Sequence, residues 1–329
     1  TGLMRFDLVR EFIRVSQVEY KLLDRGVGYV KVKQFSKGIS SDVADAIRDM
    51  SGKGATSWIL DLRYNPGGLL EEAVQLSDLF VESGTVVTTV SGRDREARRA
   101  ERGGVDTTSS LVVLVNGGSA SASEIVAGAL KNLDRAVIVG TRTFGKGTVQ
   151  ELYDNEDRSK LKLTIAQYLT PGDRSIQTLG IVPDIQLQRM YVPEKNDAIG
   201  DWVRLLPPSH SWSEKEYEVH LVSQYARDTD KPAYQLDYLY EPPQEKKTAD
   251  PADGSPPPDP AEEDASDDTL AADEITEDFE MRFGKDLVAA STASSRTALV
   301  KGAKAIVAKN RTEQDKKLTD ALSKLGVDW

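Results

Sequence analysis

A cluster of three serines and a lysine about 25 residues later are the side chains of this sequence best suited to covalent chemistry. Ser119, Ser121 and Ser123 lie in the segment GGSASASEI, and Lys146 lies in FGKGTVQ. A serine hydroxyl is a weak nucleophile, and it reacts only when a base takes its proton. The residue types therefore indicate acyl transfer to a serine, provided that the chain supplies such a base.

Lys146 is the best candidate for that base. The chain has no cysteine, and its two histidines, His210 and His220, lie far along the sequence from the serines. Lys146 stands between two glycines and close to apolar runs of strand length. Burial disfavours a charged amine, so we expect the pKa of Lys146 to fall from about 10.4 toward neutrality. A lysine in that state can accept a proton.

Two strand-to-turn transitions must position these groups. The apolar run LVVLVN (111–116) predicts a buried strand, and the glycine–serine turn after it leads into an amphipathic run. A strand, a tight turn and a helix in this order expose a serine at the edge of a sheet, beside the free N–H groups of the helix. Upstream, SWILDL (57–62) predicts a second buried strand that ends in the turn NPGG, where glycines allow a close approach of the backbone to a ligand.

Simpler interpretations of these residues remain open at this point. Any of the three serines could be a plain helix N-cap, and Ser121 has Glu124 three residues later, the capping-box pattern. Residues 140–147 nearly form a phosphate-binding loop, but Gly147 stands where that motif needs Ser or Thr.

Together the segments DLRYNPGG (61–68), GSASASEI and FGKGTVQ resemble the C-terminal processing peptidases. These are tail-specific Ser–Lys proteases, and the resemblance covers roughly residues 7 to 190. It assigns roles to six residues: Ser121 as nucleophile, Lys146 as general base, Gln150 as the residue that orients the lysine, and the backbone N–H of Ala122 with that of Gly67 or Gly68 as the oxyanion hole.

The family also implies a fold, substrates and a location. Its fold is an α/β, crotonase- and ClpP-like core of mainly parallel strands and helices, and it needs no metal or organic cofactor. Implied substrates are proteins or peptides with nonpolar C-termini, cleaved in the periplasm, at the cell envelope or outside the cell. A homo-oligomer is possible. We identify neither a PDZ-like sequence nor a signal peptide in this sequence, although the family has a PDZ domain.

Composition divides the chain into four parts. We expect a protease core at 1–200 that begins with an extended strand over 5–16, an extension at 201–240, a disordered Pro-rich acidic linker at 241–280, and one or two helices at 281–329. The formal net charge of −11 arises largely in the linker, because thirteen acidic residues and no basic one lie between Thr248 and Glu280. No apolar stretch is long enough to span a membrane, and nothing indicates nucleic-acid binding.

Within the core, strands alternate with helices. Period-2 and apolar patterns predict strands at 27–35, 84–92 and 160–171, and apolar residues at helical spacing predict helices at 40–50 and 71–81. The mixed-charge run RDREARR (93–99) is typical of a solvated loop. Alternation of this kind predicts an α/β core.

The sequence thus predicts a serine endopeptidase with a Ser121–Lys146 dyad. The chief alternative is an inactive relative that uses the same scaffold to bind peptides or a small apolar ligand. A crotonase-like acyl-CoA enzyme is a third possibility, but no signature of a site for a phosphate-rich cofactor is present.

Overall fold

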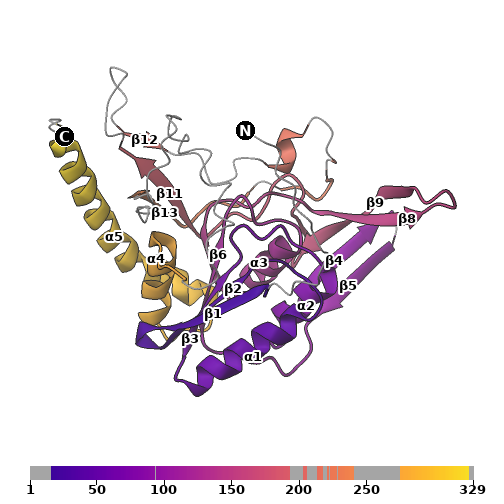
Figure 1. Ribbon diagram of the computed structural model, residues 1–329, viewed down its shortest axis with the longest axis horizontal. Coiled ribbons are helices and arrows are strands. Elements are labelled where there is room, and N and C mark those ends of the chain that lie inside the picture. Colours follow the sequence, from indigo (N-terminus) through magenta and orange to yellow (C-terminus); the bar gives the residue numbers. More distant parts are fainter. Residues whose placement is uncertain are drawn as a thin grey trace, which may run out of the picture.

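A computed structural model describes residues 16–92, 94–192, 203–205, 213–217, 221, 223–227, 229–240 and 275–325. Nearly all of the predicted strand over 5–16, both histidines and the predicted linker up to residue 274 lie outside these residues. Two β-sheets form the described part, and helices cover both faces of the larger one (Figure 1).

The larger sheet has the strand order β1-β2-β3-β6-β7-β11-β12, and β13 also pairs with β11. Its central pairs, from β2 to β11, are parallel. Strands β3 and β6 are buried along their whole length, which explains why they are continuous apolar runs. The strands are β1 Val18–Leu23, β2 Val27–Val32, β3 Ser57–Asp61, β6 Ser110–Val115, β7 Val137–Gly140, β11 Ile185–Tyr191, β12 Arg204–Leu205 and β13 Tyr234–Leu239.

Three helices pack on one face of this sheet: α1 Ile39–Gly52, α2 Leu70–Asp78 and α3 Ala122–Asn132. Their apolar side chains form one core cluster with the strands, in which Trp58 is the largest fully buried side chain. Two short 3-10 turns, η1 Asp24–Gly26 and η2 Glu214–Glu216, lie outside this layer. Helix α3 is buried along nearly its whole length, so its N-terminus is held firmly at the sheet edge.

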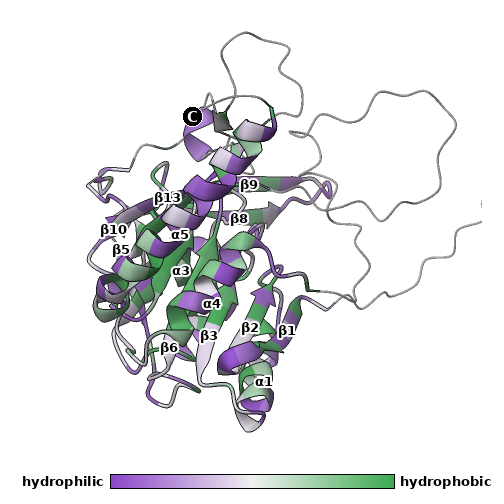
Figure 2. Ribbon diagram, turned by 90° about the vertical axis from the view of Figure 1, so that its left-hand side faces the viewer, coloured by the Kyte–Doolittle hydropathy of each residue, from purple (hydrophilic) through white to green (hydrophobic). Residues whose placement is uncertain are grey.

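Helices α4 Phe279–Ala289 and α5 Arg296–Lys324 cover the opposite face. Figure 2 shows both lying across the apolar strands of the sheet. Phe283, Leu287 and Leu299 are buried against strand residues such as Ile59 and Val112. The C-terminal helical segment, whose place the sequence left open, is therefore docked on the core.

The second sheet is entirely antiparallel and was not predicted. It contains β10 Arg174–Ser175, β9 Lys160–Thr170, β4 Thr85–Ser91 and β5 Asp94–Arg99, and β8 Thr148–Asp154 also pairs with β9. Hairpin β8–β9 projects from the body of the molecule (Figure 1). The loop predicted at 93–99 is wrong from residue 94 on, because β5 pairs there with β4 as an exposed edge strand.

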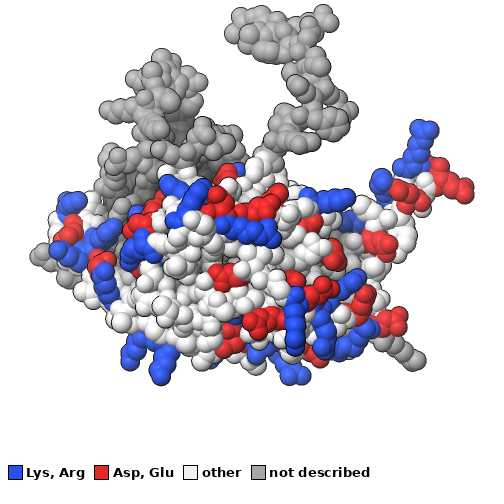
Figure 3. All heavy atoms as spheres, turned by 90° about the horizontal axis from the view of Figure 1, so that it is seen from below, with Lys and Arg blue, Asp and Glu red and all other residues white. Residues whose placement is uncertain are grey.

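The other core predictions are confirmed. The strands expected at 27–35, 84–92 and 160–171 are β2, β4 and β9, and the helices expected at 40–50 and 71–81 are α1 and α2. Basic and acidic side chains are interspersed over the face drawn in Figure 3. None of the described helices combines the length and the apolar character needed to cross a bilayer.

Candidate active site

Ser121 stands at the turn between β6 and α3, immediately before the first helical residue. Its backbone has φ 54° and ψ −111°, a conformation that side-chain-bearing residues seldom adopt. Ser121 and Glu124 form a capping box at this turn, in which the Glu124 carboxylate accepts the N–H of Ser121 over 2.9 Å. A strained serine at a strand-to-helix turn is the arrangement that exposes a nucleophile in several hydrolases.

The neighbouring serines are engaged in structural hydrogen bonds. Ser119 is fully buried, and its hydroxyl donates to the carbonyl oxygen of Leu62 over 2.8 Å. Ser123 is also fully buried, and its hydroxyl donates to the carbonyl oxygen of Asn65 over 2.8 Å. Ser121 is partly exposed, and its hydroxyl donates no hydrogen bond to an acceptor among the described residues. Of the three candidates left open by the sequence, Ser121 is therefore the one available for reaction.

The NPGG turn lies directly against the Ser121 turn. A Cβ atom on Gly67 would lie 2.6 Å from the carbonyl oxygen of Ala120 and 2.9 Å from the amide nitrogen of Ala122. Gly67 has φ +100°, so both the conformation and the close approach require glycine. Residue 67 therefore brings the upstream turn to the N-terminus of α3.

Asn65 holds these two turns together, a role that sequence reasoning missed. Its side chain is fully buried and donates to the carbonyl oxygen of Val32 over 2.7 Å. The main-chain carbonyl oxygen of Asn65 accepts from the amide of Ala120 and from the hydroxyl of Ser123. Asn65 also accepts the N–H of Gly67, through Oδ1 at 2.9 Å.

The hydrogen bond from Gly67 to Asn65 shows which of the N–H groups predicted to bind an oxyanion is already occupied. The Gly67 N–H is already used by Asn65. The N–H of Ala122 is at the first position of α3, where no helical acceptor exists, and the N–H of Gly68 has no partner among the described backbone hydrogen bonds. Ala122 and Gly68 are thus the two of the three that could donate to a ligand.

Glu124 connects the serine turn to the lysine turn. Its Oε2 atom accepts the N–H of Ser121 and the N–H of Lys146, both over 2.9 Å. Its Oε1 atom accepts the hydroxyl of Thr143 over 2.5 Å and the N–H of Gly145 over 2.7 Å. Since the amides of Ser121 and Lys146 share one oxygen atom, the two residues are spatial neighbours.

Burial raises the pKa of the Glu124 carboxyl to about 7, although these four hydrogen bonds favour its ionised form. Sequence reasoning identified Glu124 only as a capping-box partner of Ser121. The structure adds Thr143, Gly145 and Lys146 to its contacts, and these could not be anticipated from spacing along a helix.

The Lys146 side chain is half-buried. Among the described residues its amine has no hydrogen-bond or ion-pair partner, so it is not hydrogen-bonded to the Ser121 hydroxyl in this structure. Gln150 lies in β8 with an exposed side chain, and its amide nitrogen is 3.5 Å from the hydroxyl of Thr164, not on the lysine. The structure thus brings Ser121, Ala122, Gly67, Gly68 and the backbone of Lys146 together, and it leaves the Gln150 side chain apart.

A buried ionic cluster supports the NPGG turn from the far side of the sheet. Asp61 is fully buried at the end of β3, where it accepts from the hydroxyl of Tyr29 over 2.7 Å and from the guanidinium of Arg63 over 2.6 Å. Burial alone would raise the pKa of Asp61, but the charge and hydrogen bonds of Arg63 outweigh it and lower that pKa. Arg63 also donates to Asp278 over 2.6 Å and to Glu280, at the start of α4, over 2.8 Å. Arg63, two positions before Asn65, is therefore held in place by the start of α4.

The sequence profile of peptidase family S41 matches residues 26–187, which contain the NPGG turn, Ser121, Glu124 and Lys146. Residues 26–187 belong to peptidase family S41. Within the described residues, no group of three or more His, Asp or Glu side chains is arranged to hold a metal ion.

Among curated S41 relatives, the carboxy-terminal-processing protease of Bartonella bacilliformis is 42% identical over 194 residues, which cover 57% of this chain and 44% of that protein. The carboxyl-terminal-processing protease of Synechocystis is 42% identical over 183 residues, with coverages of 54% and 43%. Among solved structures, a photosystem II D1 C-terminal processing protease matches with a TM-score of 0.50 and 32% identity, over 53% of this chain and 49% of that one. The chain thus spans less than half the length of these relatives.

Proposed function

We propose that this chain carries the catalytic core of a serine endopeptidase that cleaves proteins near their C-terminal tails through a Ser121–Lys146 dyad. The observation that carries the proposal is Ser121 itself: a strained, partly exposed serine at a helix N-terminus, whose hydroxyl donates to no described acceptor and to which Glu124 fixes the Lys146 turn. Membership of residues 26–187 in family S41 and the names of the relatives support the same reaction.

In the proposed reaction the Ser121 hydroxyl attacks the scissile carbonyl carbon while the Lys146 amine, in its neutral form, takes the hydroxyl proton. The N–H groups of Ala122 and Gly68 stabilise the negative charge on the tetrahedral oxygen, and each such donor contributes on the order of a hundredfold or more to the rate. Lys146 then gives its proton to the leaving amine. Water attacks the resulting acyl-enzyme with the same lysine as base and releases the new C-terminus.

Closure of the dyad is the one geometric step that this mechanism adds. The backbone amides of Ser121 and Lys146 are neighbours, but no hydrogen bond joins the hydroxyl to the amine, and catalytic hydrogen bonds are often long in structures without substrate. Gln150 would orient the lysine only after its side chain leaves Thr164. The absence of a hydrogen bond between the side chains of Ser121 and Lys146 is also the observation that favours the alternative, a peptide-binding protein without catalysis.

The experiment compares the unmodified chain with Ser121→Ala and Lys146→Ala on an unstructured protein substrate that ends in nonpolar residues. We expect both variants to keep the fold, by circular dichroism, and to lose at least a thousandfold in cleavage rate, because removal of a nucleophile or base removes the covalent step. Ser51→Ala and Lys162→Ala, at exposed positions of α1 and β9, are the matched controls. Full activity of Ser121→Ala would end the proposal, and binding without cleavage by the unmodified chain would select the alternative.

Substrate preference, location and assembly are further parts of the proposal. We expect faster cleavage of a tail ending in nonpolar residues than of the same tail ending in charged residues, action in the periplasm, at the cell envelope or outside the cell, and possible association of identical chains. Cell fractionation and sedimentation equilibrium test the last two.

A further inference from the structure

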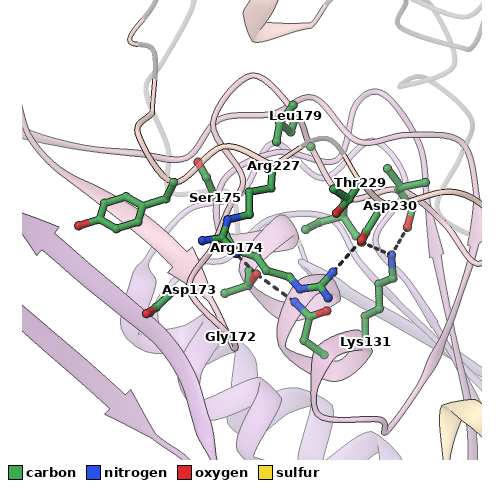
Figure 4. A pocket seen from close by; sticks show the side chains of 15 residues that line it. Lys131, Gly172, Asp173, Arg174, Ser175, Leu179, Arg227, Thr229 and Asp230 are labelled. Carbon is green, nitrogen blue, oxygen red and sulfur yellow. Dashed lines mark hydrogen bonds and ion pairs between the residues drawn. The ribbon is translucent and has the colours of Figure 1, made fainter.

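A cavity of about 200 Å³ lies at the far end of α3 from Ser121. Its walls come from the last turn of α3, the turn between β9 and β10, residues 179–182, and Tyr225, Arg227, Thr229 and Asp230 (Figure 4). Lys131, one of its lining residues, follows Ser121 by ten positions, which is about 15 Å along a helix. The cavity is therefore separate from the candidate active site.

Positive side chains outnumber the carboxylates that are free to balance them here. Lys131, Arg174 and Arg227 line the cavity together with Asp173 and Asp230. The carboxylate of Asp173 is paired with Arg95 and points away from the cluster in Figure 4. Of the two lining carboxylates, Asp230 is thus the one that pairs with lining cations, namely Lys131 and Arg174.

The hydrogen bonds leave several donors unused. Lys131, although buried, donates to Asp230 over 3.0 Å and to the carbonyl oxygen of Val182 over 2.8 Å. Arg174 donates to Asp230 through a single nitrogen, over 2.7 Å. Arg227 has no hydrogen-bond or ion-pair partner in the part of the chain that the structure describes. A guanidinium group carries five N–H donors, so most of those of Arg174 and all of those of Arg227 remain available.

A second hollow, of about 420 Å³, continues the first one and adds Asp134, Lys231 and Arg296 to its charged lining. Asp134 accepts the N–H and the hydroxyl of Thr297. Arg296 is committed to Asp184, to which it donates over 2.6 Å. Lys231 is exposed and has no partner among the described residues. The excess of positive charge therefore extends over both hollows.

The remaining lining decides which anion fits. Leu179, Ile181 and Val182 supply an apolar wall. The smaller cavity is large enough to hold water and a short aliphatic group. A doubly charged, strongly hydrated phosphate would face both the apolar wall and the carboxylate of Asp230. A single carboxylate on an aliphatic body matches the guanidinium forks and the apolar wall together.

We propose that this cavity is a binding site for an aliphatic carboxylate, with Arg174 and Arg227 holding the carboxylate and residues 179–182 contacting its apolar body. Two sources have this chemistry, the free C-terminal residue of a peptide and a small aliphatic acid. The proposal does not depend on the Ser121 chemistry, because it concerns binding alone.

The test measures binding by isothermal titration calorimetry to the full chain carrying Ser121→Ala, so that no peptide is cleaved. The probes are N-acetyl-Ala-Val with a free C-terminus, the same peptide as its C-terminal amide, isovalerate and inorganic phosphate. We expect the free-acid peptide or isovalerate to bind and the amide not to bind, with affinity decreasing as salt is added. Tighter binding of the peptide identifies a chain end as the source, and binding of isovalerate alone identifies a small acid.

Arg227→Gln and Arg174→Gln should each weaken the binding about tenfold, since each removes a charge-assisted hydrogen bond. Because Arg227 has no described partner, its substitution should leave the fold intact. Arg98→Gln, which removes an exposed arginine of β5, is the control and should change nothing. Equal binding of the amide, tighter binding of phosphate, no binding of either acid, or full affinity in Arg227→Gln would overturn the proposal.

Discussion

Replacement of Glu124 by glutamine should reduce catalytic activity much more than it reduces the stability of the fold. The substitution keeps the shape of the side chain but turns one acceptor oxygen into an NH2 group. Each oxygen of Glu124 accepts two donors, so the new NH2 group must face one of these pairs. Toward Ser121 and Lys146 it leaves two N–H groups without an acceptor. Toward Thr143 it leaves at least the N–H of Gly145 without one.

An unsatisfied buried donor costs about 1–3 kcal/mol, so the free energy of unfolding falls by about 1–6 kcal/mol from this effect. Removal of the buried charge acts in the opposite direction. The pKa of Glu124 is about 7 in the folded chain against an ordinary value of 4.5, and this difference corresponds to about 3 kcal/mol above pH 7. The two effects partly cancel, so we expect a change of at most about 3 kcal/mol in stability at pH 8.

Activity should not benefit from this cancellation. Glu124 fixes the amides of both Ser121 and Lys146, and a displacement of about 1 Å between reacting groups can cost a hundredfold in rate. We therefore expect kcat/KM of Glu124→Gln on a nonpolar-tailed protein substrate to fall at least a hundredfold at pH 8. Urea unfolding of the same samples measures the stability, and Glu71→Gln, an exposed position in α2, serves as the control.

The pH dependence of stability gives a second readout. Because the folded chain holds the Glu124 proton more tightly than the unfolded chain does, this group contributes stability that is present below pH 4.5 and is lost as the pH rises through about 7. The loss, up to about 3 kcal/mol, should be absent from Glu124→Gln. A variant with undiminished kcat/KM, or one whose stability still shows this component, would refute the role assigned to Glu124.

Three other outcomes are expected. Gly67→Ala places a Cβ atom 2.6 Å from the carbonyl oxygen of Ala120, so activity should fall at least a hundredfold, whereas Gly52→Ala, with open space around it, should leave activity unchanged; equal activities would contradict the placement of the NPGG turn. Glu280→Gln removes one carboxylate from the Arg63 cluster, so urea titration should show a free energy of unfolding lower by about 1–3 kcal/mol. Steady-state kinetics should show a decrease in kcat that is larger than the change in KM. A change in stability alone would mean that the cluster does not position the turn. Cleavage by the unmodified chain should decrease as the pH falls through 7, where Glu124 becomes protonated, and a flat rate from about pH 5 to 9 would argue against both this carboxylate and a lysine base.

The sequence predicted the elements whose signals are local. The buried strands β3 and β6 and the helices α1 and α2 follow from apolar runs and helical spacing, and the two turns follow from their glycines. Without the family resemblance, the residue pattern could not choose among Ser119, Ser121 and Ser123, because the choice depends on whether each hydroxyl meets a carbonyl oxygen from a distant segment.

Longer-range contacts account for what was missed. Glu124 accepts the N–H of Lys146, which follows β7 in the chain, and Glu280 accepts from Arg63, more than two hundred residues away. Strand β5 was predicted as a loop because charged residues on an exposed edge strand carry no apolar alternation. The excess of cations at the end of α3 likewise arises from four separate segments.

Docking of α4 and α5 on the larger sheet orders the events of biosynthesis. Every strand of that sheet leaves the ribosome before these helices do, so the face that contains Ile59 and Val112 is initially uncovered. During that interval Arg63 also lacks Asp278 and Glu280. A nascent chain that already carries Ser121 and Lys146 therefore still lacks the two helices that cover this face and the two carboxylates that pair with Arg63.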